Sequence, residues 1–191
     1  EMSDLTWVSS RIASTLDLDT IAQTVSRAAS NVLGSPRVAI FLMDEEGEFH
    51  PLAKGQLGFP GEKTQPLPAQ GQLGAEALAT QSPRAVMDVE RERRGDDLLV
   101  QWLGARAMLC APMIAPQGLR GLLVVAEDAP RVFDLHMVTL VSTYANQAAL
   151  AFQSAVLYQH ARQHVRRLSK LGEVAEALAS ARDASETADL V

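Results

Sequence analysis

Short apolar runs in the middle of the chain predict antiparallel strand pairs. Val38–Met43 is an uninterrupted apolar run between charged residues, which indicates a strand buried on both faces. Turn-forming residues follow at Asp44–Gly47, and Phe49–Ala53 returns as the partner strand. A second pair is predicted over Ala107–Ile114 and Leu119–Ala126, joined by a Pro-Gln-Gly turn. We therefore expect a sheet core built from hairpins.

Apolar residues near the N-terminus recur at helical spacing and predict two helices. Asp17 and Asp19 can cap the second helix, and Gly34 followed by Pro36 ends it. The second helix has a wide apolar face, suited to lying on a sheet. The first has a narrow stripe of Leu5, Val8, Ile12 and Leu16. We assign Leu5, Val8 and Ile12 of this stripe to a dimer interface.

Between the two strand pairs lies a long segment, Gly55–Gly104, which begins with a stretch rich in Gly, Pro and Gln. The pattern predicts short helices at Gly74–Thr80 and Asp97–Leu103 and a short strand at Arg84–Val89. Connections of this length in a compact domain are usually functional or mobile. The segment is therefore the first candidate for a binding site.

The last predicted element is a long helix with Asp134 as its N-cap and Phe133 positioned for a hydrophobic staple. One apolar stripe can pack on the sheet and comprises Val138, Val141, Ala145, Ala148, Phe152 and Ala155. A second stripe has heptad-like spacing and includes Leu150, Leu157, Leu168, Leu171 and Leu178. A helix this long outruns its domain, so we expect a coiled coil with a second copy.

Composition restricts the classes of function. The net charge of -6, with no basic patch, argues against nucleic acid. The sequence shows no signal peptide. It also lacks an apolar run of the roughly 20 residues that a membrane span needs, so we expect a cytoplasmic location. The single cysteine excludes an intrachain disulfide and a multi-cysteine metal site.

The strand and terminal-helix phrases together resemble a GAF domain. They are Arg37–Asp44, Met108–Met113, Gly118–Val124 and, most specifically, Tyr144–Tyr158. The resemblance implies an α+β fold, an α/β sandwich like that of GAF and PAS domains. Its six-stranded antiparallel sheet has helices on one face and a long C-terminal helix. It also implies a ligand pocket between the other face and the middle segment. For its lining we select alternate residues of the strands, Phe41, Met43, Met108 and Cys110, with Leu99 and Trp102 from the covering helix.

The domain organisation expected on this basis has three parts. Residues 1–17 form an N-terminal dimerisation helix, residues 18–158 the GAF domain, and residues 159–191 a signalling helix leading into a further module. The segment Leu168–Leu178 echoes Leu5–Leu16, which leaves open whether a second module of the same kind follows or whether two amphipathic helices are alike by chance.

The resemblance implies a small-molecule sensor of a signal-transduction protein, such as a two-component histidine kinase. The expected partners are a second copy of the chain and an unidentified small-molecule ligand. The chain itself is expected to be non-enzymatic. The alternatives are a ligand-free dimeric spacer and, less favoured, a GAF-type free methionine sulfoxide reductase. The dimer contacts are assigned to Leu5, Val8, Ile12, Leu157, Leu168, Leu171 and Leu178.

Specific cofactor chemistry finds little support. Cys110 lies within an apolar strand, which favours a core residue over a bilin attachment site or a catalytic thiol. Where cyclic-nucleotide-binding GAF domains carry an acidic pair after their Phe, this chain has Met137 and Val138. His160 and His164 have the i, i+4 spacing of a metal pair, but no third ligand is placed beside them. We therefore expect no cofactor and no metal.

Overall fold

The fold was examined in a computed structural model, which describes residues 2–35, 37–52, 56, 58–59, 64–69, 72–116, 118–158 and 161, without the side chains of residues 2–17. Residues up to Ser154 form one compact unit, and Ala155–Val191 is assigned to a second. The predicted seam positions Leu168, Leu171 and Leu178 lie outside the described residues, as does the His160–His164 pair.

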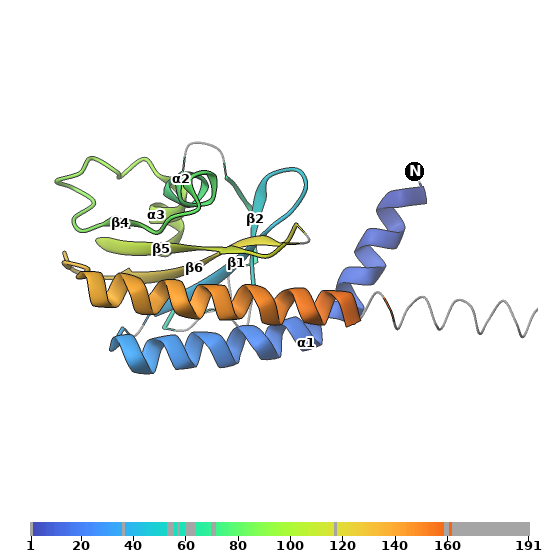
Figure 1. Cartoon of the computed structure of the whole chain (residues 1–191). Coiled ribbons are helices and arrows are strands. Elements are labelled where there is room, and N and C mark those ends of the chain that lie inside the picture. The colour runs from blue at the N-terminus through green and yellow to red at the C-terminus, as the bar shows by residue number, and fades with distance from the viewer. Residues whose placement is uncertain are drawn as a thin grey trace, which may run out of the picture. The chain divides into compact units, whose positions relative to one another are not determined.

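Six strands form one antiparallel sheet in the order β3-β2-β1-β6-β5-β4. The sheet lies between two layers of helices (Figure 1). Its three longest strands, β1, β6 and β5, are neighbours at the centre, which explains why their sequences are almost wholly apolar. The strands are β1 Arg37–Met43, β2 Glu48–Pro51, β3 Leu67–Pro68, β4 Arg84–Val86, β5 Ala107–Ile114 and β6 Arg120–Glu127.

The predicted hairpins are confirmed, and two details of the strands differ. β3 was not predicted, because two residues in a Pro-rich stretch carry no periodic signal and its pairing with β2 is a tertiary contact. β4 ends at Val86 rather than at Val89. The amide groups of Met87 and Asp88 hydrogen-bond to the Glu92 carboxylate, at 2.7 and 3.3 Å, which interrupts the strand pairing. Val89 still donates to the Arg106 carbonyl, just before β5, at 2.8 Å.

The N-terminal region forms one helix, α1 (Met2–Leu33), where the sequence predicted two. The assignment of Asp17 or Asp19 as the cap of a second helix is therefore wrong. No Gly or Pro interrupts the chain around these aspartates, and an Asp inside a helix costs only about 0.7 kcal/mol relative to Ala. The buried apolar positions Leu18, Ala22, Ala29 and Leu33 line one face of its C-terminal half.

The C-terminal helix spans residues 135–158 and lies on the same side of the sheet as α1 (Figure 1). Its predicted cap is confirmed, because Asp134 Oδ1 accepts a hydrogen bond from the Met137 amide at 2.8 Å. The predicted sheet-facing stripe is also confirmed at its centre, where Val141, Ala145, Ala148 and Phe152 have no exposed surface. No described helix is both long enough and apolar enough to cross a membrane.

Two short helices, α2 (Leu73–Thr80) and α3 (Leu98–Leu103), cover the other face of the sheet. Both come from the middle segment and match the helices predicted there. Gly74 lets α2 approach β6 closely, since a Cβ at this position would overlap Leu122 and lie 3.1 Å from the Phe49 ring. The sheet is thus buried on both faces, and the space between it and α3 is the candidate site.

Candidate functional site

The six residues predicted to line a pocket all belong to one hydrophobic cluster between the sheet and helices α2 and α3, here called the α3 cluster. Strand register explains this, because alternate residues of β1, β5 and β6 point to the same face of the sheet. Met43 and Trp102 are partly buried at its edge. The other four, Phe41, Leu99, Met108 and Cys110, have no exposed surface.

Aromatic rings connect the buried part of the α3 cluster to its rim. The Phe41 ring meets Trp102 edge-on with centroids 5.1 Å apart, and Phe49 lies 6.3 Å from Phe41. Trp102 also approaches Phe59, at 6.0 Å. Phe59 was missed from the sequence, because an isolated aromatic residue in a Gly- and Pro-rich stretch has no periodic pattern to place it. Trp102 and Phe59 are both only partly buried.

A buried carboxylate holds the N-terminus of α3. Asp97, 6% exposed, accepts hydrogen bonds from the amides of Leu99 at 2.9 Å and Val100 at 3.2 Å. Its other oxygen accepts from the Leu73 amide at 2.7 Å, at the start of α2. The Asp97 side chain therefore accepts hydrogen bonds from free amide groups in the first turns of both helices, and so joins α3 to α2. An Asp directly before an apolar helix is a recognisable cap signal, but the bond to α2 has no sequence signal.

A largely buried cation, Arg37, holds the opposite end of α3. The Arg37 guanidinium donates to the carbonyl oxygens of Leu103 and Gly104, the latter at 3.4 Å, and pairs with Asp128. It also lies 4.7 Å above the Phe59 ring, within range of a cation–π interaction. A positive charge is favourable at a helix C-terminus, where unpaired carbonyls concentrate negative potential. Arg37 thus connects β1, α3 and the rim of the α3 cluster.

The loop before α3 is tied to α2 by a further contact. Arg94 forms a two-pronged ion pair with Glu76 of α2, at 2.8 and 3.2 Å. The hydrogen bonds that Arg94 donates to the Glu76 carboxylate raise the pKa of the Arg94 guanidinium. Both side chains are about one-third or more exposed, so solvent screening keeps the contribution of this pair to stability small.

One polar group within this layer has an unsatisfied atom. Gln72, 1% exposed, lies between the α3 cluster members Ala69 and Leu73, and its Nε2 donates to the Pro68 carbonyl. Its Oε1 has no hydrogen-bond partner among the described residues. Buried amide oxygens are nearly always paired, so this position is suited to a donor brought by a ligand or a water molecule.

Cys110 is fully buried and belongs to the core of the α3 cluster. Burial raises the pKa of its thiol, and the negative charge of Asp97 raises it further. The thiol is therefore protonated at neutral pH and is a poor nucleophile. With one cysteine in the whole sequence, the thiol relay of a reductase has neither an accessible attacking group nor a resolving one.

Replacing Cys110 with Ala is expected to leave the fold intact and to cost about 1 kcal/mol, because it creates only a small cavity. In the unchanged protein, Cys110 should react with a thiol reagent far more slowly than in the urea-unfolded chain. Stopped-flow labelling of both states measures the ratio of the two rates. Equal rates would contradict the burial and reopen the question of a covalently attached ligand.

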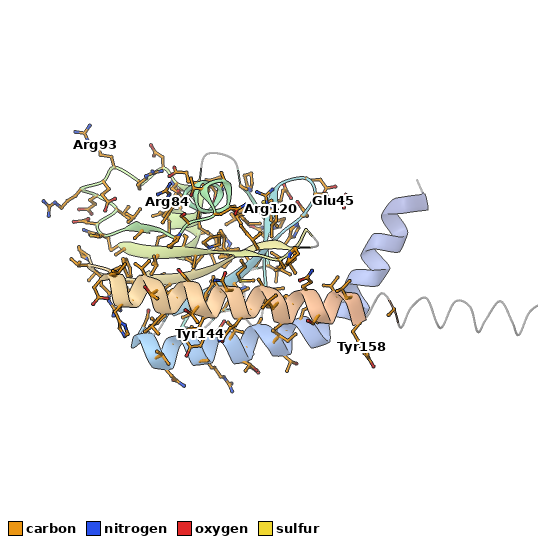
Figure 2. All side chains as sticks on the ribbon, in the orientation of Figure 1. Glu45, Arg84, Arg93, Arg120, Tyr144 and Tyr158 are labelled. Atoms are coloured by element: carbon orange, nitrogen blue, oxygen red, sulfur yellow. The ribbon has the colours of Figure 1, made fainter. Side chains whose placement is uncertain are left out.

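The predicted dimer contacts are only partly within the described residues. The side chains of Leu5, Val8 and Ile12 are not described, although all three residues lie in α1. On the C-terminal helix, Leu150 is 57% exposed and Leu157 44% exposed. Tyr158 is 66% exposed and projects from the end of the described ribbon (Figure 2). The second apolar stripe is therefore uncovered in a single copy, as far as the structure describes it.

Comparisons with known proteins agree with this architecture. The sequence profile of the GAF domain family matches residues 17–152. No match was found among curated proteins.

Solved structures with a similar fold include the PixJ GAF domain of Thermosynechococcus elongatus in its blue-light-absorbing form, at 19% identity, TM-score 0.63 and coverage of 81% of this chain and 96% of that one. Another is residues 122 to 287 of a methyl-accepting chemotaxis protein, at 20% identity and a TM-score of 0.63, with coverage of 79% of this chain and 98% of that one. A third is the GAF domain/HD domain protein of Geobacter sulfurreducens, at 21% identity and a TM-score of 0.60, with coverage of 77% of this chain and 99% of that one. At these identities the likeness shows a shared fold.

Proposed function

Because this chain belongs to the GAF domain family, we propose that it is a small-molecule-sensing and dimerisation module of a cytoplasmic signal-transduction protein. The observation that carries the proposal is the rim of the α3 cluster. There the partly buried rings of Trp102 and Phe59 lead into a buried apolar interior. A binding site of this kind is mostly apolar with a few polar groups. Arg37 supplies one above the Phe59 ring, and the unpaired oxygen of the buried Gln72 is another between Ala69 and Leu73.

The signal would travel from α3 to the terminal helices. A ligand held against Trp102 would change the position or the order of α3, whose C-terminus is bound by Arg37 at the start of β1. β1 follows α1 in the chain, and the Arg131 guanidinium donates to the Leu33 carbonyl of α1 at 3.2 Å, just before the C-terminal helix begins. Both long helices therefore join the sheet near Arg37 and Arg131. A ligand that favours one arrangement of α3 would bias the helices, and through them an output domain.

Native mass spectrometry of the purified protein tests ligand binding directly. We expect a small molecule to be retained by the unchanged protein and by Trp7→Leu, and to be lost from Trp102→Leu. The two variants make the same chemical change, one in α1 and one at the rim of the α3 cluster. Retention by Trp102→Leu would remove the proposed site. An empty protein in all three cases would favour the alternative, a GAF domain that acts only as a dimeric spacer.

The dimer is a separate part of the proposal and rests on the uncovered stripe at Leu150 and Leu157. Leu168→Asp combined with Leu171→Asp is expected to give a folded monomer, because carboxylates buried without partners in a helix seam are costly. Ser169→Asp, between the two seam positions, should remain a dimer. Light scattering at tens of micromolar protein measures the mass. A monomeric mass for the unchanged protein would contradict the proposed dimer.

A further inference from the structure

The hairpin formed by β1 and β2 brings together three side chains that can ligate a metal. Asp44 directly follows β1, while Glu48 and His50 are alternate residues of β2 and leave it on the same face. The strand register pairs Met43 with Phe49, which places Asp44 opposite Glu48 across the turn. One ligand atom from each of the three side chains lies within 4.8 Å of the others. Figure 2 shows Glu45 at the tip of this hairpin.

The hairpin itself fixes the ligand atoms. Asp44 Oδ1 accepts a hydrogen bond from the Glu48 amide at 2.8 Å, which leaves Oδ2 directed at His50 Nε2. These two side chains are mostly buried, with 11% of Asp44 and 16% of His50 exposed. The hairpin therefore confines two of the three side chains before any ion binds, which lowers the entropic cost of binding. An ion bound at His50 Nε2 would replace the hydrogen bond between that atom and Asp44.

The charge of the hairpin favours a cation. Two of its three candidate ligands are carboxylates, Asp44 and Glu48. No Lys or Arg pairs with Asp44 or Glu48 within the described ranges, so no cationic side chain there competes with an incoming ion.

We propose that Asp44, Glu48 and His50 form a binding site for a divalent transition metal, with Zn²⁺ as its best-matched ion. One imidazole nitrogen and two carboxylate oxygens suit Zn²⁺, whereas Mg²⁺ and Ca²⁺ prefer ligand sets made of oxygen alone. Ligands of a tetrahedral Zn²⁺ lie about 3.4 Å apart, given bonds of about 2.1 Å. Glu48 would swing inward by a rotation of its side chain, and water would complete the coordination.

The metal site is separate from the α3 cluster and does not depend on the proposed ligand. Phe49, between Glu48 and His50, points to the opposite face of the strand and is fully buried in the α3 cluster. A bound ion would clamp the two ends of the turn and so stiffen β2 beneath Phe49. The site therefore offers a way for metal availability to change the stability of the sheet edge next to the candidate ligand pocket.

Isothermal titration of Zn²⁺ into the chelator-treated full chain tests the proposal. Loss of a residue that only supports a metal ligand typically weakens metal binding by roughly 10–100-fold. Because His50 and Glu48 would bind the ion directly, His50→Ala and Glu48→Gln should each weaken Zn²⁺ binding by more than this. Glu45→Gln removes the same charge from the same turn and should leave the affinity unchanged within a factor of about two, since rim charges act only through screened solvent. Circular dichroism of each variant checks the fold.

The His160–His164 pair, with the i, i+4 spacing noted in the sequence, is a competing candidate that a double His→Ala variant removes. We expect this variant to retain Zn²⁺ binding with a stoichiometry of one ion per chain at the hairpin. Mg²⁺ at the same concentration should give no heat of binding. The proposal is overturned if the unchanged protein does not bind Zn²⁺, if Glu45→Gln weakens binding as much as Glu48→Gln, or if only the double His variant abolishes it.

Discussion

Asp97→Ala is expected to lower the free energy of unfolding by about 3–5 kcal/mol, because it removes a buried cap and leaves three helix amides without a partner. Those amides belong to Leu73, Leu99 and Val100, and their bonds to the carboxylate are 2.7, 2.9 and 3.2 Å long. A domain of this size has a total stability of only about 5–15 kcal/mol. The loss would therefore show clearly in urea unfolding monitored by circular dichroism.

The neighbouring aspartate provides the control. Asp96 is exposed, and Asp96→Ala should change the unfolding free energy by no more than about 0.5 kcal/mol. Asp97→Asn should fall between the two, since its amide oxygen can still cap α3 while its NH₂ group faces the Leu73 amide. Equal effects of Asp96→Ala and Asp97→Ala would show that the shared cap contributes nothing to stability.

Gly121→Ala is expected to cost about 3 kcal/mol or more, because overpacking against backbone cannot be relieved by a change of rotamer. A Cβ at this position in β6 would overlap the carbonyl oxygen of Phe41 and lie 3.2 Å from a methyl group of Leu42. Both belong to β1, the neighbouring strand, so relief requires the two central strands to separate. Differential scanning calorimetry would record the change as a lowered Tm.

Two other glycine-to-alanine substitutions serve as comparisons for the change in Tm. A Cβ at Gly95 meets no atom within 4 Å, so Gly95→Ala should leave Tm nearly unchanged. Gly74→Ala should lie between them, because the atom it overlaps is the end of the flexible Leu122 side chain, which can rotate away. If Gly121→Ala were no worse than Gly95→Ala, the close approach of β1 and β6 would be wrong.

Both substitutions act on the proposed sensor as well as on stability. Asp97 and Arg37 hold the two ends of α3, so loosening either contact changes how Trp102 is presented at the rim of the α3 cluster. Gly121 lies next to Leu122, whose side chain belongs to that cluster. If such a variant keeps its fold but no longer retains the small molecule, the cause would be a changed position of Trp102. It would not be the loss of a direct contact between the substituted residue and the ligand.

Local pattern alone was sufficient to predict most of the elements of this chain. The apolar runs of β1, β5 and β6 mark central strands because residues buried on both faces must be apolar at every position. Asp134 identified the start of the C-terminal helix because a cap acts on amides two or three residues away. Period-two alternation also grouped Phe41, Met108 and Cys110 on one face, where the structure places them.

The remaining features depend on residues that are distant in sequence, and no local pattern reports such distances. The bond from Asp97 to Leu73, the contact of Arg37 with α3 and the pairing of β3 with β2 exist only once the sheet has brought those segments together. The continuity of α1 past Asp17 and Asp19 has a local reason, because no Gly or Pro interrupts it there and an Asp inside a helix costs little. The sequence by itself thus determined the GAF architecture and the composition of its core, while tertiary structure decided which polar groups hold α3 over that core.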